Sequence, residues 1–477
     1  MSDMLSVLPP DCVIRDAAVI RERYQRNVTG LERGIAAVML PRDQEDVFRI
    51  VAAANISRVP LYPISTGKNW GLGSKLPVTD GCVVVDLSRM NRILEVDVDG
   101  PSAVIQPGVS QGQLASHLMA NFPGLTLNLT GSFGGTSIVG NVIERGDGIY
   151  SRLHDLLRVE GVLGSGEAFD AGVPLCDGAG PDLTGLFCQS NFGIVTRMRV
   201  RLLAKPERRY LWWAIAADAG LERMMDSYVK LSRQRVLSPD CVNVGYSNRF
   251  LQAIAPAGPA GWNSYAVVDG AARVADAVVE ELTASFAPFC SSVGAVRAGA
   301  PDPLSLLPPF LHPLVPQLNG AADYESLRMI YRLTGTPLPV EPAEMDADLT
   351  PFGMRSAVFV AQPSGARSRH VADVTDTIRI DSGLNIKVSF FGDGRTLVTI
   401  HFDLRDEEQT RRADEADCRL WDQFLAAGLL PYRVGIHRMD RLARMRPEYF
   451  SLAARLRVVF DPNGILAPGR YGPGQVP

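Results

Sequence analysis

The segment "LYPISTGKNWGLGSKLP", residues 61–77, places three glycines and a lysine directly after an apolar run. The lysine follows Gly67 at once, so the G-x-x-x-x-G-K-[ST] spacing of a P-loop is absent. The G-x-G-x-x-G pattern of dinucleotide folds is also absent, and Pro77 prevents a long helix from following. Glycines leave successive backbone N–H groups uncovered, so the segment predicts an anion-binding nest. The alternative is a flexible turn.

Several histidines and one aspartate are candidates for a proton acceptor. An imidazole titrates near neutral pH, so His154, His401 and His437 are each able to take a proton from a substrate. Asp147, in "RGDG", is a further candidate. Each of these side chains has an alternative interpretation as a hydrogen-bonded structural or surface group.

The composition excludes several classes of protein. The 477 residues carry a formal net charge of -4, and no basic field indicates a nucleic-acid partner. The seven cysteines are scattered without a C-x-x-C, which argues against a zinc site, so no metal is expected. No apolar run approaches 18 residues, so no membrane partner is expected. The N-terminus lacks the pattern of a signal peptide, and the chain is predicted to be cytoplasmic.

The surrounding segments predict the elements that position these residues. A helix beginning at Pro41 precedes the strand "VPLYPIS", which leads into the glycine segment. Three short β-branched runs follow in residues 81–109, and then a helix in "SQGQLASHLMANFPG". A hairpin is expected around residues 164–166, a strand over 194–203, and a strand followed by a capped helix over 395–427. Together these elements indicate an α+β fold.

Further blocks occur in a fixed order along the chain: "STGKNWGLGSKLPVTDGCVVVDLSRMNRILEVD", "AVIQPGVSQGQL", "GGTSIVGNVIERGDG", "LTGLFCQSNFGIVTRMRVRL", "LLPYRVGIHRMDRL" and "VVFDPNGILAPGRYG". In this order they resemble the FAD-dependent oxidoreductases related to vanillyl-alcohol oxidase and p-cresol methylhydroxylase (PCMH). The resemblance covers most of residues 36–205 and 430–473. It implies a two-lobed PCMH-type FAD-binding domain and a cap domain with an antiparallel sheet flanked by helices.

The resemblance also implies domain boundaries and cofactor contacts. Residues 1–206 form the FAD-binding domain, with lobes at about 36–96 and 97–206, residues 207–435 form the cap, and residues 436–477 return to the first domain. The glycine loop then wraps the FAD pyrophosphate, where Lys68 either adds charge or is a solvated surface lysine. The residues expected to contact FAD are Ser65, Thr66, Gly67, Lys68, Asn69, Trp70, Gly71, Leu72, Pro107, Gly108, Ser132, Gly134, Gly135, Ser137, Gly140, Asn141, Gly146, Gly193, Ile194, Val195 and Asn463.

Relatives often attach the flavin covalently through a histidine or tyrosine. Here Met354 or Arg355 stands near the histidyl position, and the glycine loop contains no histidine. A dissociable, non-covalent FAD is therefore expected.

The resemblance places Tyr432 and Arg433 in the substrate pocket, where a fixed guanidinium stabilises an anion. His401 and Tyr150 are the other catalytic candidates. Two departures argue against oxidation of vanillyl-type phenols. Leu72 stands where phenol oxidisers place a tyrosine, and Ser132 stands where many relatives place a carboxylate.

The predicted function is that of an FAD-dependent oxidase or dehydrogenase acting on a small molecule. A hydride passes from a benzylic, alcohol or amine carbon to flavin N5, and oxygen or an electron-carrier protein then takes the electrons. The altered pocket indicates a specialised or biosynthetic substrate, and dimers are common among the relatives. The alternatives are a non-redox, FAD-dependent group transfer and a catalytically inactive flavin-binding protein.

Overall fold

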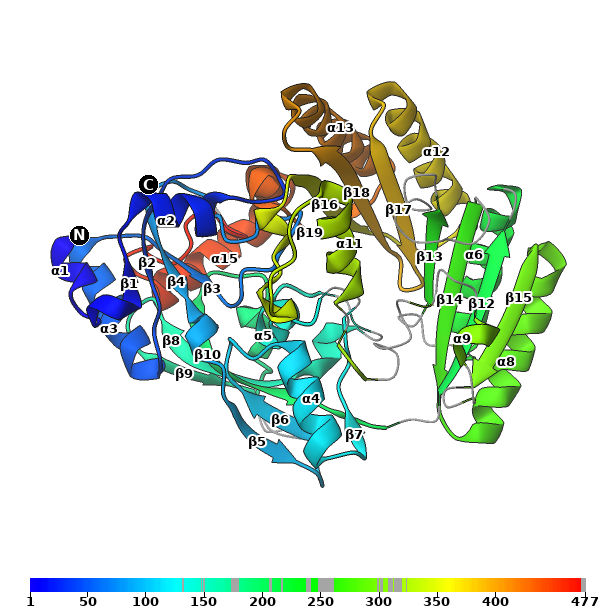
Figure 1. Cartoon of the computed structure of the whole chain (residues 1–477), viewed down its shortest axis with the longest axis horizontal. Coiled ribbons are helices and arrows are strands. Elements are labelled where there is room, and N and C mark those ends of the chain that lie inside the picture. The colour runs from blue at the N-terminus through cyan, green and yellow to red at the C-terminus, as the bar shows by residue number, and fades with distance from the viewer. Residues whose placement is uncertain are drawn as a thin grey trace.

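The computed structural model describes residues 1–130, 133–146, 148, 151–172, 180–205, 208–215, 218–236, 242–247, 261–297, 300, 303–307, 312, 320–322 and 324–472. Over these residues the strands form sheets of four, five, two and eight strands, with helices against them. The mixture of helices with mainly antiparallel sheets confirms the α+β class (Figure 1).

The four-stranded sheet carries the glycine loop at the end of one strand. Its order is β1 (Val13–Ile14), β2 (Ile35–Met39), β4 (Cys82–Asp86) and β3 (Leu61–Ile64), and β2, β4 and β3 are parallel. Helix α3 (Gln44–Ser57) connects β2 to β3 and buries Val47, Ile50, Val51 and Ala54, as predicted. It begins three residues after Pro41, because the carboxylate of Asp43 accepts the Asp46 N–H and caps the helix.

The five-stranded antiparallel sheet has the order β5 (Ile93–Asp97), β6 (Ser102–Ile105), β10 (Gly193–Arg201), β8 (Leu156–Leu163) and β9 (Ala168–Ala171). The predicted hairpin is β8 and β9. Helices α4 (Gln111–Asn121) and α5 (Ile138–Ile143) pack on this sheet through a shared apolar core. A small sheet pairs β7 (Leu125–Thr126) with β11 (Leu203–Ala204).

The eight-stranded antiparallel sheet is the largest element of the fold. Its strands, in spatial order, are β15 (Ser292–Arg297), β12 (Arg208–Ile215), β14 (Gly261–Asp269), β13 (Val242–Ser247), β17 (Asn385–Phe391), β18 (Arg395–Asp403), β16 (Phe352–Val360) and β19 (Leu430–Arg433). The helices that cover its outer face are α6 (Asp218–Arg233), α8 (Ala272–Phe286), α12 (Gly365–Ser382) and α13 (Glu407–Ala426) (Figure 1). The remaining helices are α1 (Ser2–Leu5), α2 (Ala17–Ile20), α9 (Pro303–Leu306), α11 (Glu325–Thr334), α14 (Met439–Met445) and α15 (Pro447–Phe460).

The two faces of this sheet have different neighbours. Side chains alternate along a strand, and Val398, Ile400 and Phe402 of β18 enter the apolar core beneath the helices. Thr399 therefore points to the opposite face, beside its register partner Ser356 on β16. A Cβ placed on Gly71 would lie 2.3 Å from the Ser356 hydroxyl. The sheet face that the helices leave uncovered thus meets the glycine loop, and we call it the inner face.

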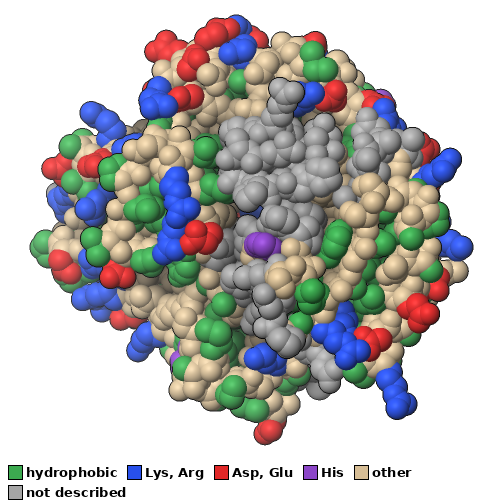
Figure 2. Space-filling model, turned by 45° about the vertical axis from the view of Figure 1, so that its right-hand side comes forward, with side chains coloured by type: hydrophobic (Ala, Val, Ile, Leu, Met, Phe, Trp, Pro, Cys, Tyr) green, Lys and Arg blue, Asp and Glu red, His purple; other side chains and the backbone are tan. Residues whose placement is uncertain are grey.

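The charged side chains show no single-sign patch on the face drawn in Figure 2, where Lys and Arg are interspersed with Asp and Glu. Among the helices of the described residues, none is long and apolar enough to cross a bilayer.

Candidate functional site

The glycine loop turns through left-handed backbone conformations that favour glycine. Gly67 has a φ of 68° and Gly71 a φ of 78°. A Cβ on Gly67 would lie 2.5 Å from the Lys75 side chain, and one on Gly71 would overlap Ser356. Both positions therefore require glycine for conformation and for space.

The loop presents a run of unused backbone donors. Within the described part of the chain, the N–H groups of residues 66 to 71 donate to no atom. Behind them, the Asn69 carbonyl accepts the N–H groups of Leu72 at 3.2 Å and Ser74 at 3.1 Å, which fixes the turn. Half-buried backbone donors without partners are rare in folded proteins. This arrangement suits an anion with several oxygens, such as a diphosphate.

Two further predicted cofactor segments meet beside this loop. The Ser137 N–H donates to the Thr66 hydroxyl at 3.1 Å, and the Ser137 hydroxyl donates to the Pro107 carbonyl at 2.6 Å. A Cβ on Gly140 would lie 2.3 Å from the Ser65 hydroxyl. The structure therefore brings together residues that lie in separate blocks of the sequence.

The other predicted glycines pack tightly against protein atoms. A Cβ on Gly108, Gly134, Gly135 or Gly146 would come within 2.6 Å of a neighbour. These contacts are Gly108 with the carbonyl of Ser88, Gly134 with Tyr324, Gly135 with Phe133, and Gly146 with Asn141.

Four other predicted contact residues lie within secondary structure or a turn. Gly193, Ile194 and Val195 pair with β8 through the ladder of strand β10. Asn463 follows helix α15 and donates from its amide to Asn55 of α3 at 2.7 Å. Ser132 and Tyr150, with Asp147, lie outside the described residues.

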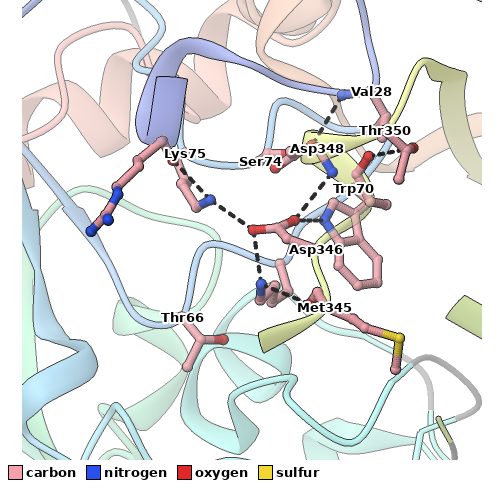
Figure 3. A network of polar contacts seen from close by, with 12 residues as sticks. Val28, Thr66, Trp70, Ser74, Lys75, Met345, Asp346, Asp348 and Thr350 are labelled. Carbon is pink, nitrogen blue, oxygen red and sulfur yellow. Dashed lines mark hydrogen bonds and ion pairs between the residues drawn. The ribbon is translucent and has the colours of Figure 1, made fainter. Parts of the chain in front are cut away.

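A buried charge cluster holds the loop from the side of the eight-stranded sheet (Figure 3). The Lys68 and Lys75 ammonium groups both lie 2.8 Å from Oδ2 of Asp346, and Trp70 Nε1 donates to Oδ1 at 2.9 Å. Burial alone would raise the pKa of Asp346, but the two ammonium groups outweigh it and hold that pKa well below its ordinary value. Lys68 is therefore a buried, paired residue, and its interpretation as a solvated surface lysine is wrong.

A second carboxylate, Asp348, lies in the same cluster. Its Oδ1 accepts the Ser74 hydroxyl at 2.9 Å and the Val28 N–H at 3.0 Å. Its Oδ2 is buried and has no partner among the described residues. Burial and the neighbouring Asp346 raise the pKa of Asp348 to about 7.

The Tyr–Arg pair contacts the loop from strand β19. Arg433 Nη2 donates to Oδ1 of Asn69 at 2.8 Å, and the Tyr432 carbonyl accepts the side-chain amide of Gln189 at 2.7 Å. The Arg395 guanidinium lies 5.5 Å from the centre of the Tyr432 ring. The structure thus joins Arg433 to the cofactor loop, and Tyr432 lies next to it on the same strand.

A buried acid–base cluster beside this pair was not predicted from the sequence. Glu144 accepts the Tyr471 hydroxyl at 2.9 Å and pairs with Arg470, which also donates to Tyr62. Burial raises the pKa of Glu144, but Arg470 and Arg433 outweigh it and keep that pKa below its ordinary value. The residues lie in the quoted "ERGDG" and "APGRYG" blocks, but nothing in their spacing indicates that these blocks touch.

The histidine candidates differ in their surroundings. His401 lies on the inner face, where Nε2 is 3.0 Å from the Thr399 hydroxyl. Burial and the nearby Lys387 lower the pKa of His401 to about 3, so its imidazole is a weak base. His437 is buried against the Asp417 carboxylate at 3.1 Å, and His154 is exposed.

The positions near the expected flavin linkage carry no nucleophile. Met354 packs against the apolar cluster that contains Phe133, while Arg355 points to the helix side of the sheet and pairs with Asp414. Across the described ranges, no group of three or more His, Cys, Asp and Glu side chains could hold a metal ion.

Comparison with known proteins supports a flavin site. Residues 35–172 match the model of an FAD binding domain, and residues 369–471 match that of the C-terminal domain of FAD linked oxidases. The 1'-carboxy-chondrochloren decarboxylase of Chondromyces crocatus is 28% identical over 92% of this chain and 90% of its own length. The 4-cresol dehydrogenase [hydroxylating] flavoprotein subunit of Pseudomonas putida is 26% identical over 90% of this chain and 86% of its own.

Two solved structures share the fold. Substrate-bound p-cresol methylhydroxylase has a TM-score of 0.84 at 24% identity, covering 99% of this chain and 96% of its own. The 4-ethylphenol oxidase of Gulosibacter chungangensis has a TM-score of 0.85 at 22% identity, covering 100% and 97%.

Fold and domain matches together define a flavin-dependent oxidoreductase, and FAD is its cofactor. The chain belongs to the PCMH-type FAD-linked oxidase family. The residues present fit the cofactor, because the unused donors of residues 66 to 71 form a cradle that glycine keeps open.

Proposed function

We propose that this protein takes a hydride from a benzylic, alcohol or amine carbon of a small organic substrate to N5 of its FAD. The flavin supplies the hydride acceptor, and the protein positions the reactants. The observation that carries the proposal is the contact between Arg433 and Asn69, which joins the Tyr–Arg pair to the loop of unused donors. In this assignment residues 1–206 and 436–477 bind the cofactor, and residues 207–435 cap it.

The inner face and the loop have separate tasks in this proposal. The backbone donors of residues 66 to 71 bind the pyrophosphate. Arg433 keeps its Nε buried and without a partner among the described residues, so it can stabilise negative charge on a substrate or a reduced cofactor. Tyr432 stands next to it on β19 and orients the substrate.

Leu72 restricts the substrate. Its side chain is only 3% exposed, and its carbonyl accepts the Ile436 N–H at 3.1 Å, so the residue is fixed in place. A leucine cannot hydrogen-bond a phenolate, which argues for a specialised substrate rather than a simple vanillyl-type phenol. The relative named as the decarboxylase of a carboxy compound makes carboxylated substrates the first class to test.

Absorbance of the purified protein, before and after acid precipitation, tests the cofactor and its linkage. We expect flavin in the protein and its release into the supernatant, because neither Met354 nor Arg355 can form a covalent bond to it. Flavin that stays with the precipitate would contradict the non-covalent assignment.

Anaerobic mixing with candidate substrates tests the redox step. We expect a subset of benzylic, alcohol or amine compounds to bleach the flavin, and Arg433→Met to slow that bleaching by about 100-fold. Reoxidation by oxygen or by an artificial acceptor then separates an oxidase from a dehydrogenase. A bound flavin that no compound of these classes reduces would favour the non-redox alternatives.

A further inference from the structure

Lys387 lies on the inner face of the eight-stranded sheet. Its neighbours on β17, Ile386 and Val388, are buried in the core beneath the helices, so the Lys387 side chain points the other way. Its register partner on β18 is Thr399. Thr399 in turn pairs with Ser356, the residue that abuts Gly71 of the cofactor loop. Three neighbouring strands therefore place Lys387 on the side of the sheet that faces the FAD site.

The Lys387 side chain is half-buried and its charge is uncompensated. Among the residues that the structure describes, it makes no hydrogen bond and no ion pair, and burial alone lowers its pKa. Its charge also depresses the pKa of the neighbouring His401. A charge that is partly withdrawn from solvent loses hydration, and in proteins such charges are commonly paired.

The nearby groups of the inner face cannot serve as its counter-ion. Ser389 and Thr399, on either side of it, are neutral. Asp403 lies at the far end of β18 and pairs with Arg405 at 2.6 Å. Arg395, another cation of this face, already binds Asp393. Lys387 is thus a cation on a polar face whose counter-ion the described residues do not supply.

We propose that Lys387 binds the carboxylate of the substrate, so that the substrates of this enzyme are small organic acids. The inference rests on the proposed function, because it places the acid between the inner face and the FAD. One ammonium balances one carboxylate, and the hydroxyl groups of Ser389 and Thr399 can donate to the remaining lone pairs. The pairing forms only when substrate enters, so in the free protein this half-buried charge has no partner among the described residues.

Titration of the FAD-loaded protein with matched acids and amides tests this assignment. The probes are benzoate, phenylacetate and 3-phenylpropionate, each beside its primary amide, and the readout is the perturbation of the flavin absorbance. We expect the wild-type protein to bind at least one acid about 10-fold or more tightly than its amide. Lys387→Gln should remove that preference and leave the affinity for the amide unchanged.

Two further variants make the result specific. Lys387→Arg should retain most of the preference for acids, because the guanidinium also pairs with a carboxylate. If Lys387 instead acted as a proton acceptor, arginine could not replace it, because the guanidinium stays protonated. Lys230→Gln, at an exposed position of helix α6, should behave as the wild-type protein. A preference that survives in Lys387→Gln would overturn the assignment.

If a variant fails to fold, the relative affinities of the wild-type protein for acids and amides still test the inference. A wild-type protein that binds no acid more tightly than its amide overturns it, even where the flavin is present and can be reduced. Absence of flavin reduction by every substrate class, with a clear preference for acids, instead rejects the proposed function and keeps Lys387 as an anion site.

Discussion

Two regions of this protein hold lysine side chains that are partly withdrawn from solvent, and the two regions differ in how the charge is compensated. Beneath the cofactor loop, Lys68 and Lys75 share the carboxylate of Asp346, so the charge is compensated within the protein. On the inner face of the eight-stranded sheet, Lys387 has no counter-ion among the described residues. The paired charges of the first region hold the loop in place. In our proposal, the charge of Lys387 in the second region is neutralised by a bound ligand.

The largest expected effect comes from breaking the compensated region. Asp346→Asn keeps the shape of the side chain but leaves two buried ammonium groups without a carboxylate. We expect the free energy of unfolding to fall by about 3–5 kcal/mol, measured by denaturant titration. Asp422→Asn, which breaks an exposed pair with Arg441, is the control and should change it by less than about 1 kcal/mol. Equal effects of the two variants would refute the comparison.

A substitution in the loop itself should release the cofactor. Gly71→Ala introduces a Cβ that overlaps Ser356, whereas Gly81→Ala, at nearly the same φ, meets nothing within 4 Å. We expect Gly71→Ala to weaken FAD binding by about 10- to 100-fold, in line with overpacking of about 1–3 kcal/mol. Both substitutions strain the backbone to a similar extent, so Gly81→Ala is the control that shows the effect of this strain without the overlap. FAD contents that stay equal in the two purified variants would show that the loop does not bind the cofactor.

The cluster beneath the loop also predicts a dependence of stability on pH. Asp348 has a folded pKa of about 7, well above the value of an unfolded aspartate, so the folded state retains the proton. Between about pH 4 and about pH 7 the folded state binds more protons than the unfolded state, and wild-type stability falls as the pH rises. Asp348→Asn removes this slope. As the pH rises from about 4 to about 7, the free energy of unfolding of the variant should increasingly exceed that of the wild-type protein. A difference that stays constant over this range would exclude a raised pKa of Asp348.

The smallest effect should appear at Lys387. Lys387→Met removes a half-buried charge that has no counter-ion among the described residues, so we expect an unfolding free energy that is unchanged or higher by about 1 kcal/mol in the absence of ligand. The same substitution at Lys75 removes a paired charge and should destabilise the protein by several kcal/mol. Loss of stability in both variants would mean that Lys387 has a partner within the protein.

Local patterns were sufficient to predict much of the fold. The strand before the glycine loop, the apolar face of α3 and the hairpin of β8 and β9 depend on neighbouring residues, and the structure has all of them. The start of α3 was missed because Asp43, rather than Pro41, provides the cap. The order of the sequence blocks was enough to predict FAD and the family.

The site could be predicted only in part, because its charges are paired across long stretches of chain. Nothing near Lys68 in the sequence indicates that Asp346 will neutralise it. Nothing near Lys387 indicates that no described carboxylate will pair with it. Likewise, a histidine on a strand looks available for proton transfer until burial and Lys387 lower the pKa of His401. Register and burial decide these properties, and neither is visible in local composition.

Titration of the apoprotein tests most directly whether the unused donors of residues 66 to 71 hold the FAD pyrophosphate. The flavin is removed by a mild acid treatment, and the protein is refilled with FAD or with riboflavin, which lacks both phosphates. We predict that FAD binds about 100-fold or more tightly than riboflavin, and that Gly71→Ala removes most of this difference while Gly81→Ala keeps it. Similar affinities of the wild-type protein for FAD and riboflavin would contradict the assignment of the loop.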